Sequence, residues 1–212
     1  MSRDTDRAAR FWDRLAERYA LRPVPDEATY QRKLALTREI LRPDMALLEL
    51  GCGSGTTALH HAPHVASVLA TDISPQMIAI ARRKVAAQGA TNVRCEVASL
   101  ETLPDPDARF DVVLALNLLH LLPDWSEALR RIHALLRPGG AFVSSTMCVG
   151  DSALRYLRWI VPIGETLGLL PSLRVFTADE LLAALRAAGF EIEHDWRPGP
   201  AKAVFLIARK AR

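Results

Sequence analysis

The chain is poor in cysteine, in aromatic residues and in excess charge, and each scarcity excludes a class of protein. Its three cysteines among 212 residues are odd in number and widely spaced, which excludes a disulfide scaffold and favours a reducing, cytoplasmic location. Aromatic residues make up only 6%, and 27 basic against 24 acidic residues leave a net charge of +3. The basic residues that close the chain at 209–212 are expected to be a solvated tail. We therefore expect no nucleic-acid partner, since such proteins usually combine basic stripes with aromatic platforms.

The sequence also lacks an apolar leader and a long uncharged hydrophobic run. Asp4 and Asp6 stand where a signal peptide would be apolar, so none is expected. Residues 153–173 form the most apolar stretch, but charged residues and a proline interrupt it, which makes a membrane span unfavourable. At this length a single core buries enough surface to fold without disulfides or metals.

What the sequence does contain is an alternation of apolar segments with amphipathic ones. Strands are expected at residues 45–50, 65–71, 92–97, 110–116, 140–146, 190–194 and 203–208. Segments of helical period lie between them, and a capping box of Thr177 and Glu180 opens the last helix. The alternation predicts an α/β fold with a parallel sheet covered on both faces. The short link between the last two strands favours an antiparallel pair.

The most informative segment is a glycine-rich turn, ELGCGSG at residues 49–55, placed between a predicted strand and a predicted helix. Its glycines permit a tight turn and the close approach of a ligand. A dinucleotide fingerprint reads G-x-G-x-x-G, whereas this turn reads G-x-G-x-G. Asp72 ends the next predicted strand, 21 residues after Gly51, where an acid can accept hydrogen bonds from both ribose hydroxyls. NAD or another adenosyl ligand would satisfy Asp72, and the glycine spacing disfavours NAD.

Four segments taken in order resemble the successive motifs of the class I S-adenosylmethionine-dependent methyltransferases. They are ELGCGSG at 49–55, DIS at 72–74, FDVVLALN at 110–117 and LLRPGG at 135–140. The resemblance covers about residues 45–146 and is closest to small bacterial enzymes of the methyltransferase-11 type. It implies a Rossmann-like, doubly wound sheet of seven strands, six parallel and one antiparallel. It also implies S-adenosyl-L-methionine as cofactor and S-adenosyl-L-homocysteine as product.

The same resemblance implies roles for the residues of the glycine turn and the acid. Glu49 would orient the amino group of the cofactor, and Gly51, Cys52 and Gly53 would line its methionine end. Asp72 would bind the ribose. These five residues are therefore the expected contacts with the polar parts of the cofactor.

Other matched residues are expected at the adenine ring and at the reacting sulfur. Ile73 and Met77 would pack against adenine, whose faces need apolar partners. Leu116 and Asn117 would lie near the sulfonium. The family often carries an acid for the adenine amino group where this chain has Ser99, and a serine oxygen accepts that hydrogen bond more weakly.

Methyl transfer from a sulfonium is an in-line displacement, so the protein mainly supplies proximity and alignment. No metal is expected. A base is needed only when the acceptor must lose a proton, and His120 is the histidine placed to serve, against a structural role at the start of a loop. His60, His61 and His64 lie close in sequence but are expected to be solvated rather than to bind a metal.

The regions outside the core are expected to select a small-molecule acceptor. We divide the chain into an N-terminal helical cap (1–44) and a Rossmann-like domain (45–212) with a lid-like apolar insertion (152–176). Tyr19 of the cap is a candidate to fold over the cofactor. The insertion either packs on the sheet edge or faces a hydrophobic acceptor, and contact with a membrane surface through it is an alternative that we do not predict.

The sequence thus predicts a methyltransferase that acts on a small, hydrophobic acceptor. One alternative is an NAD(P)-dependent oxidoreductase, which is disfavoured by the glycine spacing and by the absence of a Tyr-x-x-x-Lys pair. The other is a cofactor-binding module without activity of its own that serves a partner protein. Neither the acceptor atom nor the oligomeric state follows from the sequence.

Overall fold

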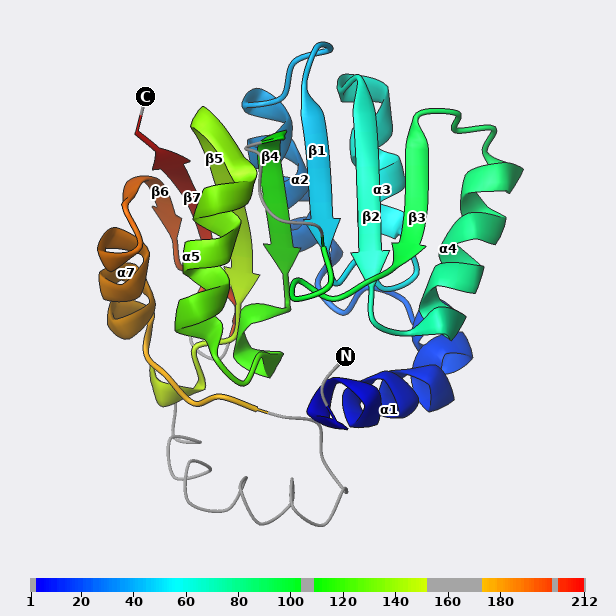
Figure 1. Cartoon of the computed structure of the whole chain (residues 1–212), viewed down its shortest axis with the longest axis horizontal. Helices are drawn as coiled ribbons and strands as arrows, with labels where there is room; N and C mark the ends of the chain where they lie inside the picture. Colours follow the sequence, from blue (N-terminus) through cyan, green and yellow to red (C-terminus); the bar gives the residue numbers. More distant parts are fainter. Residues whose placement is uncertain (1–2, 104–108, 152–172, 200–201, 212) are drawn as a thin grey trace. The chain divides into compact units, whose positions relative to one another are not determined.

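The computed structural model describes residues 3–103, 109–151, 173–199 and 202–211 (Figure 1). Its helices are α1 (Arg3–Ala20), α2 (Glu27–Glu39), α3 (Thr56–His61), α4 (Pro75–Ala87), α5 (Trp125–Leu135) and α7 (Ala178–Ala187). Short 3-10 helices are η1 (Ala62–His64), η2 (Leu119–Leu121) and η3 (Val149–Asp151). The strands are β1 (Ala46–Leu50), β2 (Ser67–Asp72), β3 (Val93–Val97), β4 (Phe110–Leu116), β5 (Leu136–Thr146), β6 (Phe190–Trp196) and β7 (Val204–Lys210).

The strands form one seven-stranded sheet in the order β3-β2-β1-β4-β5-β7-β6. β1 pairs in parallel with β2, and β2 pairs in parallel with β3. β7 runs antiparallel to both β5 and β6, so the sheet has six parallel strands and one antiparallel strand. The predicted Rossmann-like fold is confirmed. One strand boundary was wrong, because β5 begins at Leu136 and includes the Pro138-Gly139-Gly140 segment that we expected as a turn.

The chain divides into two compact units, residues 1–105 with 110–114 and residues 106–109 with 115–212. In the first unit, α1 packs along α4 through Ala16, Met77 and Ile80. The α4 helix starts where the sequence predicts, because Ser74 accepts a hydrogen bond from the Met77 N–H and Pro75 occupies the first turn. The predicted division at residue 44 stays a prediction, and both N-terminal helices belong to this first unit.

The second unit is built on the antiparallel strands β5, β7 and β6. Phe142 on β5 and Phe190 on β6 have ring centroids 5.6 Å apart, and Phe205 on β7 is fully buried. The β6–β7 register shifts between Ile192 and His194. Helix α7 begins with the predicted capping box, in which Thr177 and Glu180 satisfy each other's backbone N–H groups.

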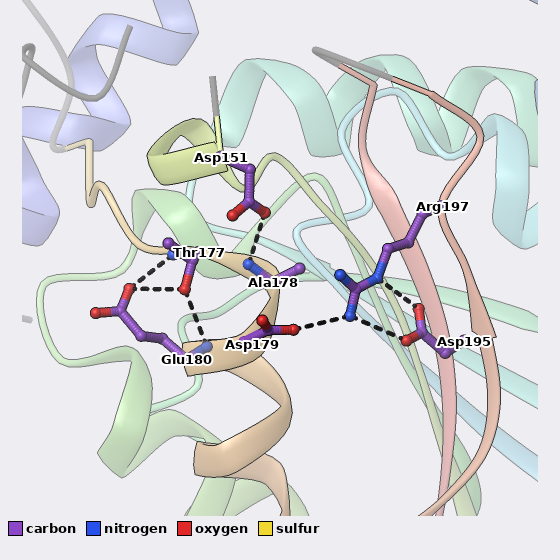
Figure 2. Close-up of polar contacts among 7 residues, drawn as sticks. All are labelled: Asp151, Thr177, Ala178, Asp179, Glu180, Asp195 and Arg197. Atoms are coloured by element: carbon purple, nitrogen blue, oxygen red, sulfur yellow. Dashed lines mark hydrogen bonds and ion pairs between the residues drawn. The ribbon is translucent and has the colours of Figure 1, made fainter. Parts of the chain in front are cut away.

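The two ends of the apolar insertion are held together by polar contacts (Figure 2). The Gly150 N–H donates to the Phe176 carbonyl at 3.0 Å, and the Ala178 N–H donates to the Asp151 carboxylate at 2.8 Å. A Cβ at position 150 would stand 2.8 Å from the carbonyl carbon of Phe176, so glycine is required for this approach. Residues 152–172 of the expected insertion lie outside the described part of the chain. No helix among the described residues is long and apolar enough to cross a bilayer.

Candidate cofactor site

The glycine turn between β1 and α3 adopts the backbone that its sequence predicts. Gly51, Gly53 and Gly55 have φ values of 63°, 52° and 75°, which L side chains rarely adopt. The turn is closed by a 3.0 Å hydrogen bond from the Gly55 N–H to the Cys52 carbonyl, and the Cys52 N–H donates to Thr71 of β2 at 2.9 Å. The backbone thus offers a surface without side chains at the carboxyl end of β1, where open α/β sheets bind ligands.

Asp72 at the end of β2 holds this turn in place. Its carboxylate accepts hydrogen bonds from the N–H groups of Gly53 at 2.8 Å and Ser74 at 2.9 Å. Burial raises the pKa of Asp72, while the hydrogen bonds from Ser74 and Gly53 lower it. Each carboxylate oxygen has two acceptor positions, so these bonds leave capacity for ribose hydroxyls.

Glu49 on β1 presents a buried carboxylate to the same turn. It is 3% exposed, and no described residue forms a hydrogen bond with its Oε2 atom. Burial, together with the charge of Asp72, raises the pKa of Glu49 to about 8, and a hydrogen bond from the Ala58 backbone opposes this shift. An orphaned buried acceptor is costly unless a partner reaches it. A cationic group such as a ligand ammonium would satisfy it, so Glu49 and Asp72 fit the amino and ribose groups of S-adenosylmethionine.

Tyr19 reaches the glycine turn because α1 is tied to the start of α4. The Asp13 carboxylate accepts from the Ser74 hydroxyl at 2.6 Å and from the Gln76 N–H at 3.1 Å. Tyr19 then stands 3.6 Å from the position that a Gly53 Cβ would take. Burial and the charges of Asp72 and Glu49 raise the pKa of the Tyr19 phenol. In Figure 1, α1 lies at the same end of the first unit as the carboxyl ends of β1–β3. Asp13 was missed by the sequence reasoning because no local pattern signals a contact across 61 residues.

The remaining expected residues of the first unit are placed in different ways. Cys52 is 8% exposed within the turn, and burial raises its thiol pKa well above the usual value. Ile73 is half-buried beside Asp72, whereas Met77 is 2% exposed in the α1–α4 contact. The contact of Met77 with adenine therefore stays a prediction, and half-buried Ile73 is the more accessible of the two. Ser99 is half-buried in a turn, where its N–H donates to Thr102 at 2.9 Å.

One apolar residue near Asp72 was not singled out from the sequence. Val97 ends β3 in register with Asp72, and it is 44% exposed although it is aliphatic. The Ala98 N–H donates to the Asp72 carbonyl at 3.0 Å, which keeps this segment next to β2. The signal was available, because the residue that ends β3 lies beside the residue that ends β2 in a parallel pair.

Leu116, Asn117 and His120 belong to the second unit, and their proposed roles stay predictions. Asn117 follows β4 with φ 57°, the only positive φ among the described residues other than glycine, and its N–H donates to Ser145 at 2.6 Å. His120 in η2 is 8% exposed, and its Nδ1 atom has no hydrogen-bond partner among the residues that the structure describes. Burial lowers the pKa of His120 to about 4, so its ring is neutral at physiological pH.

The expectation that the clustered histidines are all solvated was wrong for His61. His60 is exposed, but His61 is fully buried on α3, and burial lowers its pKa to about 3. The six-residue helix α3 is too short to show a clear periodicity, which is why the buried position could not be recognised.

Comparisons with known proteins agree with the class that this fold and site define. Residues 47–140 match the family model described as a methyltransferase domain. An uncharacterized methyltransferase, YcgJ, of Bacillus subtilis is 30% identical over 102 residues, covering 48% of this chain and 40% of that protein. A ubiquinone biosynthesis O-methyltransferase of Pseudomonas aeruginosa is 29% identical over 191 residues, covering 88% of this chain and 80% of that protein.

A crystal structure of an S-adenosylmethionine-dependent methyltransferase from Mesorhizobium loti superimposes with a TM-score of 0.69 at 25% identity, covering 84% of this chain and 96% of that one. The chain spans about half or less of the length of the first relatives that it matches. The glycine turn and Asp72 both lie within residues 47–140, which the family model matches. Residues 47–140 of the chain are therefore similar to a methyltransferase domain, and its fold resembles that of an S-adenosylmethionine-dependent methyltransferase of known structure.

Proposed function

We propose that the protein transfers a methyl group from S-adenosyl-L-methionine to a small, apolar acceptor. The observation that carries this proposal is the pair of buried carboxylates at the glycine turn. Asp72 fixes the turn by accepting the Gly53 N–H, and the unpartnered Oε2 of Glu49 requires a donor such as an ammonium group. A dinucleotide has no ammonium to offer, so the site supports the proposed cofactor better than NAD(P).

The chemistry divides simply between the cofactor and the chain. The cofactor, when bound, supplies a methyl group on a sulfonium that is already activated for displacement. Glu49 and Asp72 bind and orient its polar groups, while Tyr19 covers the turn and limits the access of water. No metal is needed for such a displacement.

We further propose that the acceptor atom is a hydroxyl oxygen and that His120 takes its proton. Matched relatives are named ubiquinone biosynthesis O-methyltransferases, which supports an oxygen acceptor on an apolar molecule. A pKa of about 4 keeps the His120 ring unprotonated at physiological pH, and no described residue forms a hydrogen bond with its buried Nδ1. The neutral ring can accept a proton, and its lowered pKa makes it a weaker base than an exposed histidine.

The cofactor is tested by calorimetric titration with S-adenosylhomocysteine, with NADH as the control ligand. Saturable binding of S-adenosylhomocysteine alone supports the proposal, and binding of NADH alone refutes it. Binding of neither ligand supports the module that depends on a partner. Asp72→Ala should weaken binding by about 1–3 kcal/mol, since charge-assisted hydrogen bonds are lost. Asp44→Ala, which removes an exposed carboxylate paired with Arg42, is the matched control and should not change the affinity.

The base is tested by single-turnover methylation of phenolic and aliphatic alcohols. His120→Gln should lower the rate by about 10²–10⁴-fold while the affinity for S-adenosylhomocysteine stays the same. His64→Gln, a half-buried histidine of the first unit, is the control. An unchanged rate in His120→Gln would leave His120 with a structural role only.

A further inference from the structure

Helix α1 has an exposed side that carries arginines and a buried side that packs on α4. Arg7, Arg10, Arg14 and Arg18 are all exposed, and their spacing of three and four residues places them along one side of the helix. The side that contacts α4 carries Ala9 and Ala16, both buried, and lies opposite to these arginines. We name Arg7, Arg10, Arg14 and Arg18 the arginine face. The sequence analysis considered consecutive basic residues only and therefore did not recognise this periodic arrangement.

The acids of α1 leave three arginines of this face, Arg10, Arg14 and Arg18, without an ion pair in the described part of the chain. Asp13 is bound to Ser74 and Gln76, and Glu17 forms a 2.9 Å ion pair with Arg83 of α4. The other acids of the helix lie in its first turn. The helix carries five arginines against four acids, so the arginine face is a local arrangement and not an excess of charge on the helix.

Exposed apolar residues continue the arginine face at the end of α1. The Leu21 N–H donates to the Glu17 carbonyl at 3.2 Å, so Leu21 still follows the helical path and falls on the side of Arg14 and Arg18. Its side chain is 83% exposed, and Val24 in the following link is 41% exposed. Two exposed aliphatic residues therefore lie next to the arginine face.

We propose that the arginine face and Leu21 form a docking surface for an anionic phospholipid bilayer. Arginines would bind lipid phosphates, and Leu21 would enter the apolar boundary beneath the headgroups, as in interfacial amphipathic helices. The aliphatic end of the surface favours a bilayer over nucleic acid, whose binding surfaces carry stacking aromatics. The proposal goes beyond methyl transfer and does not depend on it. Docking would place the whole chain where apolar molecules concentrate.

The experiment measures co-sedimentation of the full chain with vesicles of phosphatidylcholine alone or with about one third phosphatidylglycerol. The chain should bind only the anionic vesicles, and salt should weaken the binding. The triple variant Arg10→Gln, Arg14→Gln, Arg18→Gln keeps good helix formers. Its binding should fall by about 100-fold, from roughly fivefold for each arginine.

A second triple variant provides the matched control. Arg42→Gln, Arg94→Gln and Arg130→Gln together remove the same charge from arginines that pair with acids elsewhere on the surface. This control should keep most of the binding, and Leu21→Asp alone should lose most of it.

Three results would overturn the proposal. They are equal losses in the two triple variants, no binding of the unaltered chain to anionic vesicles, and retention of an RNA oligomer through the arginine face without vesicle binding. Titration with S-adenosylhomocysteine, made on the same preparations, reports separately on the cofactor site. A chain that binds vesicles but not S-adenosylhomocysteine would support docking and contradict the proposed function.

Discussion

Replacing the third glycine of the turn with alanine tests why the sequence reads G-x-G-x-G. Gly55 has φ +75°, and a Cβ on it would stand 2.8 Å from the Cβ of Ala81 and 3.3 Å from its Cα. Real side chains do not approach this closely, and the Ala81 side is helix backbone that cannot move independently. Gly55 therefore permits α3 to approach α4. This packing alone explains why the third position of the turn is glycine, without reference to a ligand.

The magnitude has two separable parts. An L residue in the left-handed region costs about 1–2 kcal/mol, and forced overpacking adds about 1–3 kcal/mol. Gly55→Ala should thus lower the free energy of unfolding by about 2–5 kcal/mol. Gly89→Ala is the control, because Gly89 has φ +63° with nothing within 4 Å of its Cβ position. Gly89→Ala should lower the free energy of unfolding only by the cost of the left-handed backbone, about 1–2 kcal/mol.

A double-mutant cycle with Ala81→Gly isolates the contact. Alone, Ala81→Gly destabilises α4 by about 1 kcal/mol, the usual difference between glycine and alanine in a helix. Combined with Gly55→Ala it removes the clash, so the pair should be more stable than the sum predicts by about 1–3 kcal/mol. Urea unfolding followed by circular dichroism measures all four proteins. Equal effects of Gly55→Ala and Gly89→Ala, with no coupling to Ala81, would refute the steric argument.

Two further predictions concern Glu49 and Arg174. The folded pKa of Glu49, about 8, exceeds its usual value of 4.5, so the fold should lose stability as pH rises from 4.5 to about 8. Glu49→Gln should remove this slope in urea unfolding measured across the window, and an unchanged slope would assign it to another group. Arg174 binds the turn after β4, donating from its N–H to the His120 carbonyl at 2.7 Å and from its guanidinium to Pro123 at 3.1 Å. Arg174→Ala keeps the backbone bond to His120 and removes the guanidinium bond to Pro123, so any effect on kcat should come from a looser turn after β4 while unfolding shifts by less than about 1 kcal/mol. Arg174→Lys should rescue kcat in part, and an equal effect on kcat in Arg186→Ala would contradict this.

The parts of the fold that the sequence predicts are those governed by local rules. The strand, glycine turn and helix at residues 46–61 follow from backbone requirements, and Ser74 and Thr177 start helices because their hydroxyls accept N–H groups. The antiparallel β7 follows from the short link before it. Each of these signals spans only a few residues, so it can be recognised without knowledge of the tertiary structure.

Predictions failed or stayed open where distant contacts decide. The depth of Met77 depends on α1, which packs over it from sixty residues away in sequence, and apolar character alone does not distinguish a core position from a cofactor contact. The buried position of His61 could not be recognised because α3 is too short to show a periodicity. The tether from Asp13 to Ser74 has no sequence signal, although it sets the position of Tyr19. The candidate site is therefore predictable in its turn and its acid, and not in what covers them.

The carboxylates at the turn explain why a fold would retain an unfavourable arrangement. Burial raises the pKa of Glu49 and that of Asp72, and the charge of Asp72 raises the pKa of Glu49 further. Without a ligand, protonation of Glu49 removes the repulsion between the two carboxylates. A cationic ligand makes that proton unnecessary, because its ammonium provides the charge that Oε2 lacks. Below about pH 8, binding of the ammonium should therefore be coupled to release of the proton from Glu49, a coupling that an uncharged adenosyl ligand would not show.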